Sequence, residues 1–156
     1  MAIPNHPLLE KDTALYYGNS MRRVFTPGDL LVCREIPFDD FQPGDIAAFF
    51  PPDQGKSGIV HRIIARDRDC LTTMGDNNPC PDRHRVTPDD TPRLVIARRL
   101  SGGRQLPVTR GRDGLRQFRI NRIRRAVRLF ARRIVWGTAR LFGLQNALRR
   151  IRRAHR

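Results

Sequence analysis

The chain has 156 residues, a formal net charge of +15 and an isoelectric point near 11.5. This length suits one domain of ordinary size and excludes two full ones. The charge is uneven along the chain. Residues 1–97 hold eleven Lys and Arg against fourteen acidic residues, whereas the remainder holds nineteen Arg and one acid, Asp113. A uniformly basic domain is therefore excluded, and the excess charge belongs to a C-terminal tail.

The cysteine content argues against a disulfide-stapled secreted domain. Cys33, Cys70 and Cys80 are odd in number and form no close pair in the sequence, so we expect reduced thiols. The first 18 residues show no positive region followed by an apolar run, so we expect no signal peptide, and no window approaches the roughly 20 apolar residues of a spanning helix. We expect a cytoplasmic or peripherally membrane-associated protein.

Short apolar runs separated by turn residues predict a strand-rich domain. Two Pro-Gly-Asp turns, at 27–29 and 43–45, each open such a run. Residues 75–92 are rich in Pro, Asp and Asn and predict one long loop, a kind of segment that is often functional. The predicted strands cover residues 30–33, 46–50, 59–65, 70–74 and 94–100.

The character of the sequence changes after residue 100. Residues 101–115 contain Gly, Arg and Pro and predict a linker, and residues 116–156 predict a basic amphipathic helix that Gly137 and Gly143 divide. Such a helix can lie on an anionic membrane, pack on the domain or pair with a partner. Its apolar stripe steps by three and four residues through Ile120, Ile123, Val127, Phe130, Ile134, Leu141, Leu144, Leu148 and Ile151.

Four motifs in residues 18–97 resemble, in the same order, those of the signal peptidase I family. Gly18-Asn19-Ser20-Met21 resembles the nucleophile segment, and Gln42-Pro43-Gly44-Asp45 resembles the second turn. Ile59-Val60-His61-Arg62-Ile63 resembles the strand that bears the base, and Gly75-Asp76-Asn77-Asn78, with Asp82 beyond it, resembles the Gly-Asp-Asn-Asn segment. Four ordered matches are more specific than any one motif.

The resemblance implies a catalytic triad. Ser20 would be the nucleophile, His61 the general base and Asp82 the acid that orients it, with Asp76 as an alternative or supporting acid. Bacterial members commonly use lysine as the base, whereas the archaeal and endoplasmic-reticulum branch has histidine there. Lys56 is the one candidate lysine near this strand, so the histidine interpretation is preferred.

The chemistry agrees with these roles. A serine hydroxyl is a poor nucleophile until a base takes its proton, and imidazole is suited to that transfer at neutral pH. The backbone N–H groups of Ser20 and Met21 are the expected oxyanion donors. Some family members have a serine hydroxyl two residues before the nucleophile, where this chain has Gly18, so a side-chain donor from that position is absent.

The resemblance also implies a fold and an activity. We expect the β-rich peptidase fold shared by signal peptidase I and self-cleaving repressors over residues 1–100, with a core at 18–97, followed by the linker and the helix. The expected activity is cleavage of precursor proteins after small residues through an acyl-enzyme, with no cofactor. Cys70, Cys80, His61 and His84 match no zinc-ligand spacing, so no metal is expected.

The main alternative is a catalytically degenerate binding module whose arginine-rich tail binds nucleic acid or an anionic membrane. Retention of all three catalytic residue types argues against degeneracy. The expected partners are a precursor protein and, through Arg116 to Arg156, an anionic membrane surface. Nucleic acid is less favoured because the tail lacks the aromatic interleaving of single-strand binders.

Overall fold

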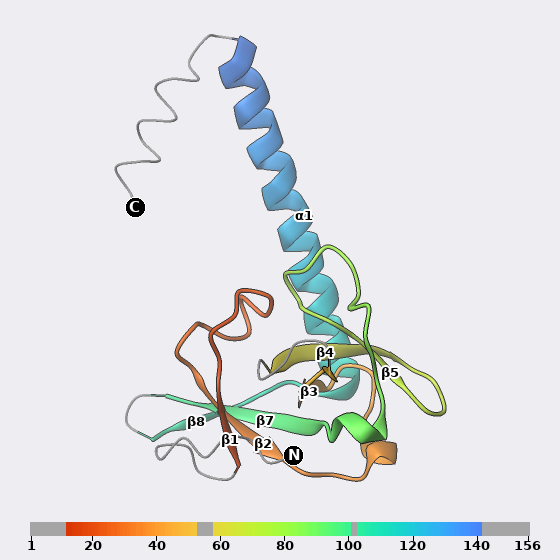
Figure 1. The fold of residues 1–156 in the computed structure, drawn as a ribbon. Helices are drawn as coiled ribbons and strands as arrows, with labels where there is room; N and C mark the ends of the chain where they lie inside the picture. The colour runs from red at the N-terminus through yellow and green to blue at the C-terminus, as the bar shows by residue number, and fades with distance from the viewer. Residues whose placement is uncertain (1–11, 53–57, 101–102, 142–156) are drawn as a thin grey trace. The chain divides into compact units, whose positions relative to one another are not determined.

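The computed structural model describes residues 12–52, 58–100 and 103–141, with side chains up to residue 135 (Figure 1). The chain divides into two compact units, Met1–Asn121 and Arg122–Arg156, which are treated separately below. The first unit is mainly β, and its strands form one antiparallel sheet. A single described α-helix, α1, follows the strands.

The sheet has the order β1-β2-β7-β3-β4-β5-β6, with β8 paired to β7. Register shifts lie between Val32 and Cys33 and between Ile63 and Ala65, and such bulges bend the strands that contain them. The strands span Thr13–Leu15 (β1), Leu30–Arg34 (β2), Ile46–Phe49 (β3), Ile59–Arg66 (β4), Leu71–Met74 (β5), Arg85–Val86 (β6), Arg93–Arg99 (β7) and Gln105–Pro107 (β8).

All five predicted strands are confirmed to within one residue at each end, as β2, β3, β4, β5 and β7. The strands that the sequence did not predict are β1, β6 and β8, each of three residues or fewer. Such short strands show no periodicity, and pairing with longer neighbours creates them. The prediction of one long loop at 75–92 was therefore wrong in part, because it contains β6 and the 3₁₀ turn η3 (Pro88–Asp90).

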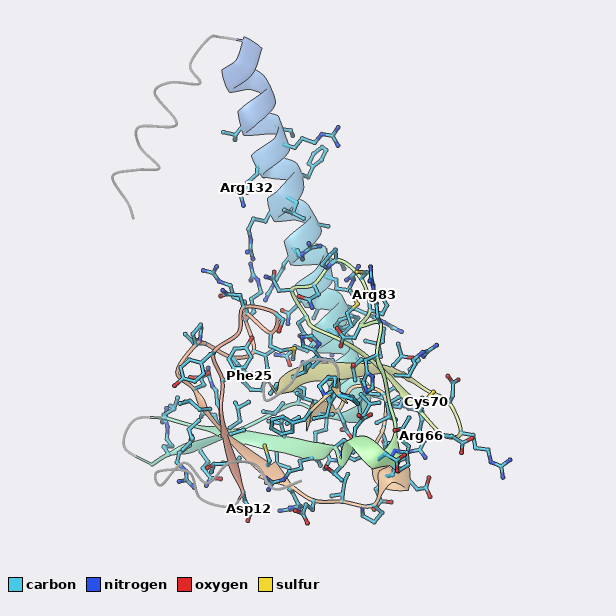
Figure 2. The ribbon with its side chains drawn as sticks, viewed as in Figure 1. Asp12, Phe25, Arg66, Cys70, Arg83 and Arg132 are labelled. Carbon is cyan, nitrogen blue, oxygen red and sulfur yellow. The ribbon has the colours of Figure 1, made fainter. Side chains whose placement is uncertain are left out.

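Two apolar clusters form the core, one on each side of β3 and β7. The first centres on Tyr16, Met21, Phe25, Leu31 and Val95, and the second on Phe41, Phe49, Ile63, Leu71 and Leu94. Arg66, labelled in Figure 2, ends β4 and donates hydrogen bonds of 2.9 Å to three carbonyl oxygens around the 3₁₀ turn η1 (Phe38–Asp40). These bonds hold the chain between β2 and β3 against the sheet.

The predicted linker at 101–115 was wrong in part. Its residues form β8, and α1 (Gly111–Leu141) begins within it rather than at residue 116. The reason is tertiary packing, because the Gly44 turn lies directly against the first helical turn. A Cβ on Gly44 would be 1.8 Å from the Gly111 carbonyl oxygen, and Gly44 also has a φ of +101°, which favours glycine.

The second unit contains the rest of α1. The helix continues through Gly137, so the predicted division at that residue was wrong, while Gly143 and residues 142–156 lie outside the described part of the chain. The predicted apolar stripe is exposed where its side chains are described, with Ile123, Val127 and Phe130 each more than 60% exposed. Among the described residues, no helix is long and apolar enough to cross a membrane.

Candidate active site

The predicted base and acid form a close pair. His61 lies in β4 opposite Ala47 of β3, and its ring is buried in the sheet. Its Nδ1 is 2.6 Å from Oδ2 of Asp82, which comes from the chain after β5. A carboxylate at this position favours a proton on Nδ1, which leaves Nε2 of the neutral ring as the nitrogen that can accept a proton. This is the arrangement that a general base requires.

A third residue holds the acid of this pair. The hydroxyl of Thr73, in β5, donates a hydrogen bond of 2.7 Å to the same Oδ2 of Asp82, and the Asp82 amide donates to the Thr73 carbonyl at 2.9 Å. Thr73 is completely buried. The acid is thus tied to the sheet by both its backbone and its side chain, so its orientation toward His61 is set by β5.

The Ser20 segment lies against the end of the same strands. Arg62 pairs with Met74 in the β4–β5 register, and one residue beyond this pair the strands reach His61 and Gly75. Gly75 has no side chain, and a Cβ there would be 2.8 Å from the Cβ of Ser20. The Ser20 carbonyl also accepts a hydrogen bond of 2.7 Å from the Asn77 amide. Ser20 therefore occupies the space beside the strand end that carries His61.

Asp76, the alternative acid, has a different set of partners. It is 1% exposed, and its two carboxylate oxygens accept from Nε and Nη2 of Arg62 at 2.9 and 3.2 Å. The amide of Asn121, in α1, donates to Asp76 Oδ2 at 2.8 Å. Arg62 is also fully buried and donates to the Gly44 carbonyl at 2.8 Å. Because buried charges need such partners, this cluster supports the loop next to Ser20, and His61 contacts Asp82 instead.

One of the two expected oxyanion donors is already engaged. The Met21 amide donates a hydrogen bond of 2.8 Å to the hydroxyl of Tyr16. The Met21 side chain is fully buried, and its sulfur accepts from the Asp76 amide at 3.4 Å. The backbone around Ser20 is thus anchored at three successive points: the Ser20 carbonyl, the Met21 amide and the Met21 sulfur.

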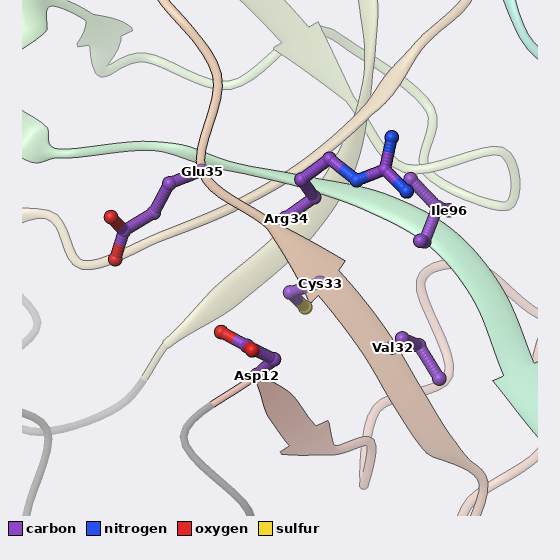
Figure 3. Close-up of a pocket in the computed structure, with 6 residues that line it drawn as sticks. All are labelled: Asp12, Val32, Cys33, Arg34, Glu35 and Ile96. Atoms are coloured by element: carbon purple, nitrogen blue, oxygen red, sulfur yellow. The ribbon is translucent and has the colours of Figure 1, made fainter.

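A pocket of about 390 Å³ lies elsewhere, on the β2 side of the sheet (Figure 3). Asp12, Cys33 and Glu35 contribute to its wall, and none of the predicted catalytic residues does. Burial raises the pKa of the Cys33 thiol to about 11, against the opposing effect of Arg93. A thiol with this pKa is protonated at neutral pH and is a poor nucleophile.

The three thiols are free, as the sequence predicts, with Cys33 buried and Cys80 exposed. The four residues weighed as a zinc set are separate. His61 contacts Asp82, and His84 contacts Asp90 at 2.9 Å. Within residues 12–52, 58–100 and 103–141, no group of three or more His, Cys, Asp or Glu side chains could hold a metal ion.

Comparison of the chain with protein-family models, curated proteins and solved structures finds no match. The site therefore rests on the residues themselves. Tyr16, Thr73, Arg62 and Asn121 also belong to this region, and the sequence alone does not indicate it. No sequence pattern distinguishes these side chains. The carboxylate partner of Arg62 and Asn121 lies 14 and 45 residues away, and Tyr16 and Thr73 meet partners 5 and 9 residues away only because the intervening chain folds back.

Proposed function

We propose that this protein is a serine endopeptidase with Ser20 as nucleophile, His61 as general base and Asp82 as the orienting acid. The observation that carries the proposal is the 2.6 Å contact between His61 Nδ1 and Asp82 Oδ2, beside a strand end against which Ser20 packs. A histidine whose Nδ1 is paired with a carboxylate, in the same region as a serine, is the pattern used in nucleophilic acyl transfer.

The proposed reaction has two halves. In the first, Ser20 Oγ forms a bond to the carbonyl carbon of the substrate while its proton passes to His61 Nε2. The tetrahedral intermediate then collapses, the C–N bond breaks, and His61 returns the proton to the departing amine. In the second half, water replaces the amine, and hydrolysis of the ester releases the new carboxyl terminus and regenerates Ser20. Asp82 stabilises the imidazolium that forms in each half.

The ordered motifs at residues 18–97 support the proposal that the enzyme is of the signal peptidase I type. They resemble the signal peptidase I family, which implies the β-rich peptidase fold and a preference for small residues at the first and third positions before the cut. The antiparallel sheet is compatible with that fold. The substrate class we propose is a precursor protein with such residues at its processing site.

The test is a mass-spectrometric survey of protein N-termini in the native host, comparing the wild type with Ser20→Ala. The sequence contains two other serines, and Ser101→Ala is the matched control. We expect a small set of N-termini to be lost with Ser20→Ala and retained with Ser101→Ala, each preceded in its precursor by small residues. Incubation of a precursor found in this way with the purified proteins then reports cleavage directly.

The competing function is a non-catalytic binding module. It predicts identical N-termini in the three strains and no cleavage by the purified wild-type protein. Those two results together would overturn the peptidase proposal and direct attention to the arginine-rich helix.

A further inference from the structure

The buried hydroxyl of Tyr16 lies beside the Ser20 turn, and the role inferred for it below rests on the proposed peptidase function. Tyr16 follows β1, and its ring packs against Phe25, labelled in Figure 2, with the centroids 5.6 Å apart. Its backbone is held by Gly28, whose amide donates to the Tyr16 carbonyl at 2.7 Å. Only 4% of the residue is exposed. The hydroxyl is therefore held in one position instead of sampling solvent.

That hydroxyl lies over the turn that carries Ser20. A Cβ on Gly18 would be 3.1 Å from Tyr16 Oη, and the Met21 amide is 2.8 Å from the same atom. The phenol thus lies beside the residue two positions before Ser20 and bonds the residue after it. Gly18 permits this approach because any side chain there would crowd the ring.

The Met21 amide uses a lone pair of the hydroxyl and leaves its proton available. Among the described residues, Tyr16 Oη has one hydrogen-bond partner, the Met21 amide. A phenol that accepts one bond becomes a better donor for a second, because the two bonds polarise each other. An amide that points at Tyr16 is also not aimed at a substrate oxygen.

We propose that Tyr16 is a catalytic residue that donates its O–H to the oxyanion formed when Ser20 attacks. As the Ser20 Oγ–carbon bond forms, the carbonyl π electrons move to oxygen, and that negative oxygen accepts the Tyr16 hydrogen bond. No proton is transferred in this interaction. The Tyr16 hydroxyl then takes the part that sequence reasoning assigned to the Met21 amide, and the Ser20 amide is the second donor.

A fluorophosphonate probe tests this role without a known substrate. Ser20 Oγ forms a bond to phosphorus, fluoride leaves and the proton goes to His61, through an intermediate with the same negative oxygen. We expect Tyr16→Phe to slow labelling of Ser20 by about 100- to 1,000-fold, the range for loss of one oxyanion donor. Tyr17→Phe is the matched control, because Tyr17 is 74% exposed, and it should label at the wild-type rate.

The choice of phenylalanine separates a catalytic role from a structural one. Tyr16→Phe removes the hydroxyl alone and keeps the ring that packs against Phe25, so a variant that unfolds at the wild-type temperature but labels slowly has lost the oxyanion donor. Thermal unfolding of each variant reports folding independently. If Tyr16→Phe folds and labels within twofold of wild type, the Met21 amide or another donor serves the oxyanion and the role is overturned. If the wild type itself does not label, the peptidase proposal fails, and this role fails with it.

A second inference rests on the exposed stripe of α1 and does not depend on the peptidase activity. In the first unit, α1 buries Gly114, Phe118 and Asn121, which lie on a different face from the stripe. At 100° per residue, Ile123, Val127 and Phe130 fall within about 60° of one another. These three side chains are 61–66% exposed. The stripe therefore lies on a different face of α1 from the residues that are buried in the first unit.

Arginines cover the other faces of the same segment. Residues 122–135 contain six arginines and no acidic residue, including Arg132, labelled in Figure 2. A polyanion complements this charge, and an apolar stripe between arginines favours one that also offers hydrocarbon. We propose that this segment binds an anionic lipid surface, with the stripe in the acyl boundary and the arginines among the headgroups. A nucleic acid would satisfy the charge and leave the stripe exposed.

Co-sedimentation of full-length Ser20→Ala protein with vesicles tests this surface. We expect binding to vesicles of phosphatidylcholine with 30% phosphatidylglycerol, a composition chosen for the assay, and little binding to phosphatidylcholine alone. Val127→Ser with Phe130→Ser should weaken binding at least tenfold, because two apolar side chains leave the membrane. Leu129→Ser is the matched control, since Leu129 is 47% exposed and lies at least about 100° around the helix from the stripe residues, and it should bind within about threefold of the parent.

Arg124→Gln with Arg128→Gln should weaken binding by roughly 25-fold, from about fivefold per arginine near an anionic surface. Equal loss in the stripe variant and the Leu129 control would overturn the insertion of the stripe. Absence of vesicle binding, or tighter binding to duplex DNA that is insensitive to the stripe substitutions, would overturn the lipid assignment and favour nucleic acid.

Discussion

The side-chain amide of Asn121 donates a 2.8 Å hydrogen bond to Oδ2 of Asp76, which joins the third turn of α1 to the loop that supports Ser20. The same carboxylate pairs with Arg62, the residue after His61. The helix is therefore part of the support of the candidate site. The two acids of the region, Asp76 and Asp82, have separate surroundings and should have separable roles.

Asp76→Asn should mainly lower the stability of the protein, whereas Asp82→Asn should mainly lower its kcat. Asp76→Asn leaves the Arg62 guanidinium buried without its counter-charge, so we expect the free energy of unfolding to fall by about 3–5 kcal/mol. Asp82→Asn should change stability little and lower kcat by about 10⁴-fold, because it favours the wrong tautomer of His61. Urea denaturation and the labelling rate of Ser20 measure the two effects. A stable Asp76→Asn protein with Asp82→Asn unfolded would contradict this division.

Thr73→Val should lower the peptidase activity while it changes the shape of the buried side chain little. The substitution removes the hydroxyl that donates to Asp82 Oδ2 while keeping a β-branched side chain in β5. We expect about a tenfold loss of kcat, since hydrogen bonds to charged groups contribute roughly 1.5–3 kcal/mol and part of this is recovered by relaxation. Thr72→Val, one residue away on the other face of β5, is the control and should retain wild-type kcat.

Gly44→Ala should destabilise the protein far more than Gly28→Ala. Both glycines are the middle residue of a Pro-Gly-Asp turn, and their φ angles are similar, +101° at Gly44 and +97° at Gly28. Around Gly28 an added Cβ meets nothing within 4 Å, so only the backbone strain of about 1 kcal/mol is expected. At Gly44 the Cβ meets the Gly111 carbonyl, so we expect a loss of more than about 3 kcal/mol as the helix is displaced. Equal losses in chemical denaturation would show that the contact with α1 is unimportant.

Cys33 should make stability fall with alkaline pH. Burial raises the folded-state pKa of Cys33 from 9.0 to about 11. Because the folded pKa is the higher one, the buried neutral thiol contributes its stability in full below pH 9, and this contribution is lost as pH rises toward 11. The lost part is roughly 2 kcal/mol. Unfolding free energies from pH 8 to 11 should therefore decline less steeply in Cys33→Ala.

Alkylation provides an independent check of the same thiol. At pH 8, iodoacetamide should modify exposed Cys80 in the folded protein, and Cys33 should react only on unfolding. Rapid modification of Cys33 in the folded state, located by peptide mass spectrometry, would contradict its burial.

Much of the sheet could be predicted from local sequence, because apolar runs bounded by Pro-Gly-Asp turns specify strands through residues that are adjacent in the chain. The five longer strands were found in this way. The candidate triad was likewise accessible, since Ser20, His61 and Asp82 stand in ordered motifs. The resemblance favoured Asp82 over Asp76 as the acid, but the sequence could not give the surroundings of either. Only the folded structure shows that Asp82 contacts His61 and Thr73, whereas Asp76 contacts Arg62 and Asn121 of α1.

The sequence predicted α1 only in part. Its periodicity was visible in the sequence, and its start was not, because the first turn is set by the close approach of Gly44 to Gly111 across the fold. Tyr16 and Met21 are only five residues apart, but no sequence pattern indicates that the Tyr16 hydroxyl meets the Met21 amide, because both residues are positioned by packing in the same apolar cluster. Periodicity and turn chemistry act within about ten residues, so they determine elements and motifs. Burial, counter-charges and hydrogen-bond partners join residues far apart in the chain, and only the folded arrangement selects among them.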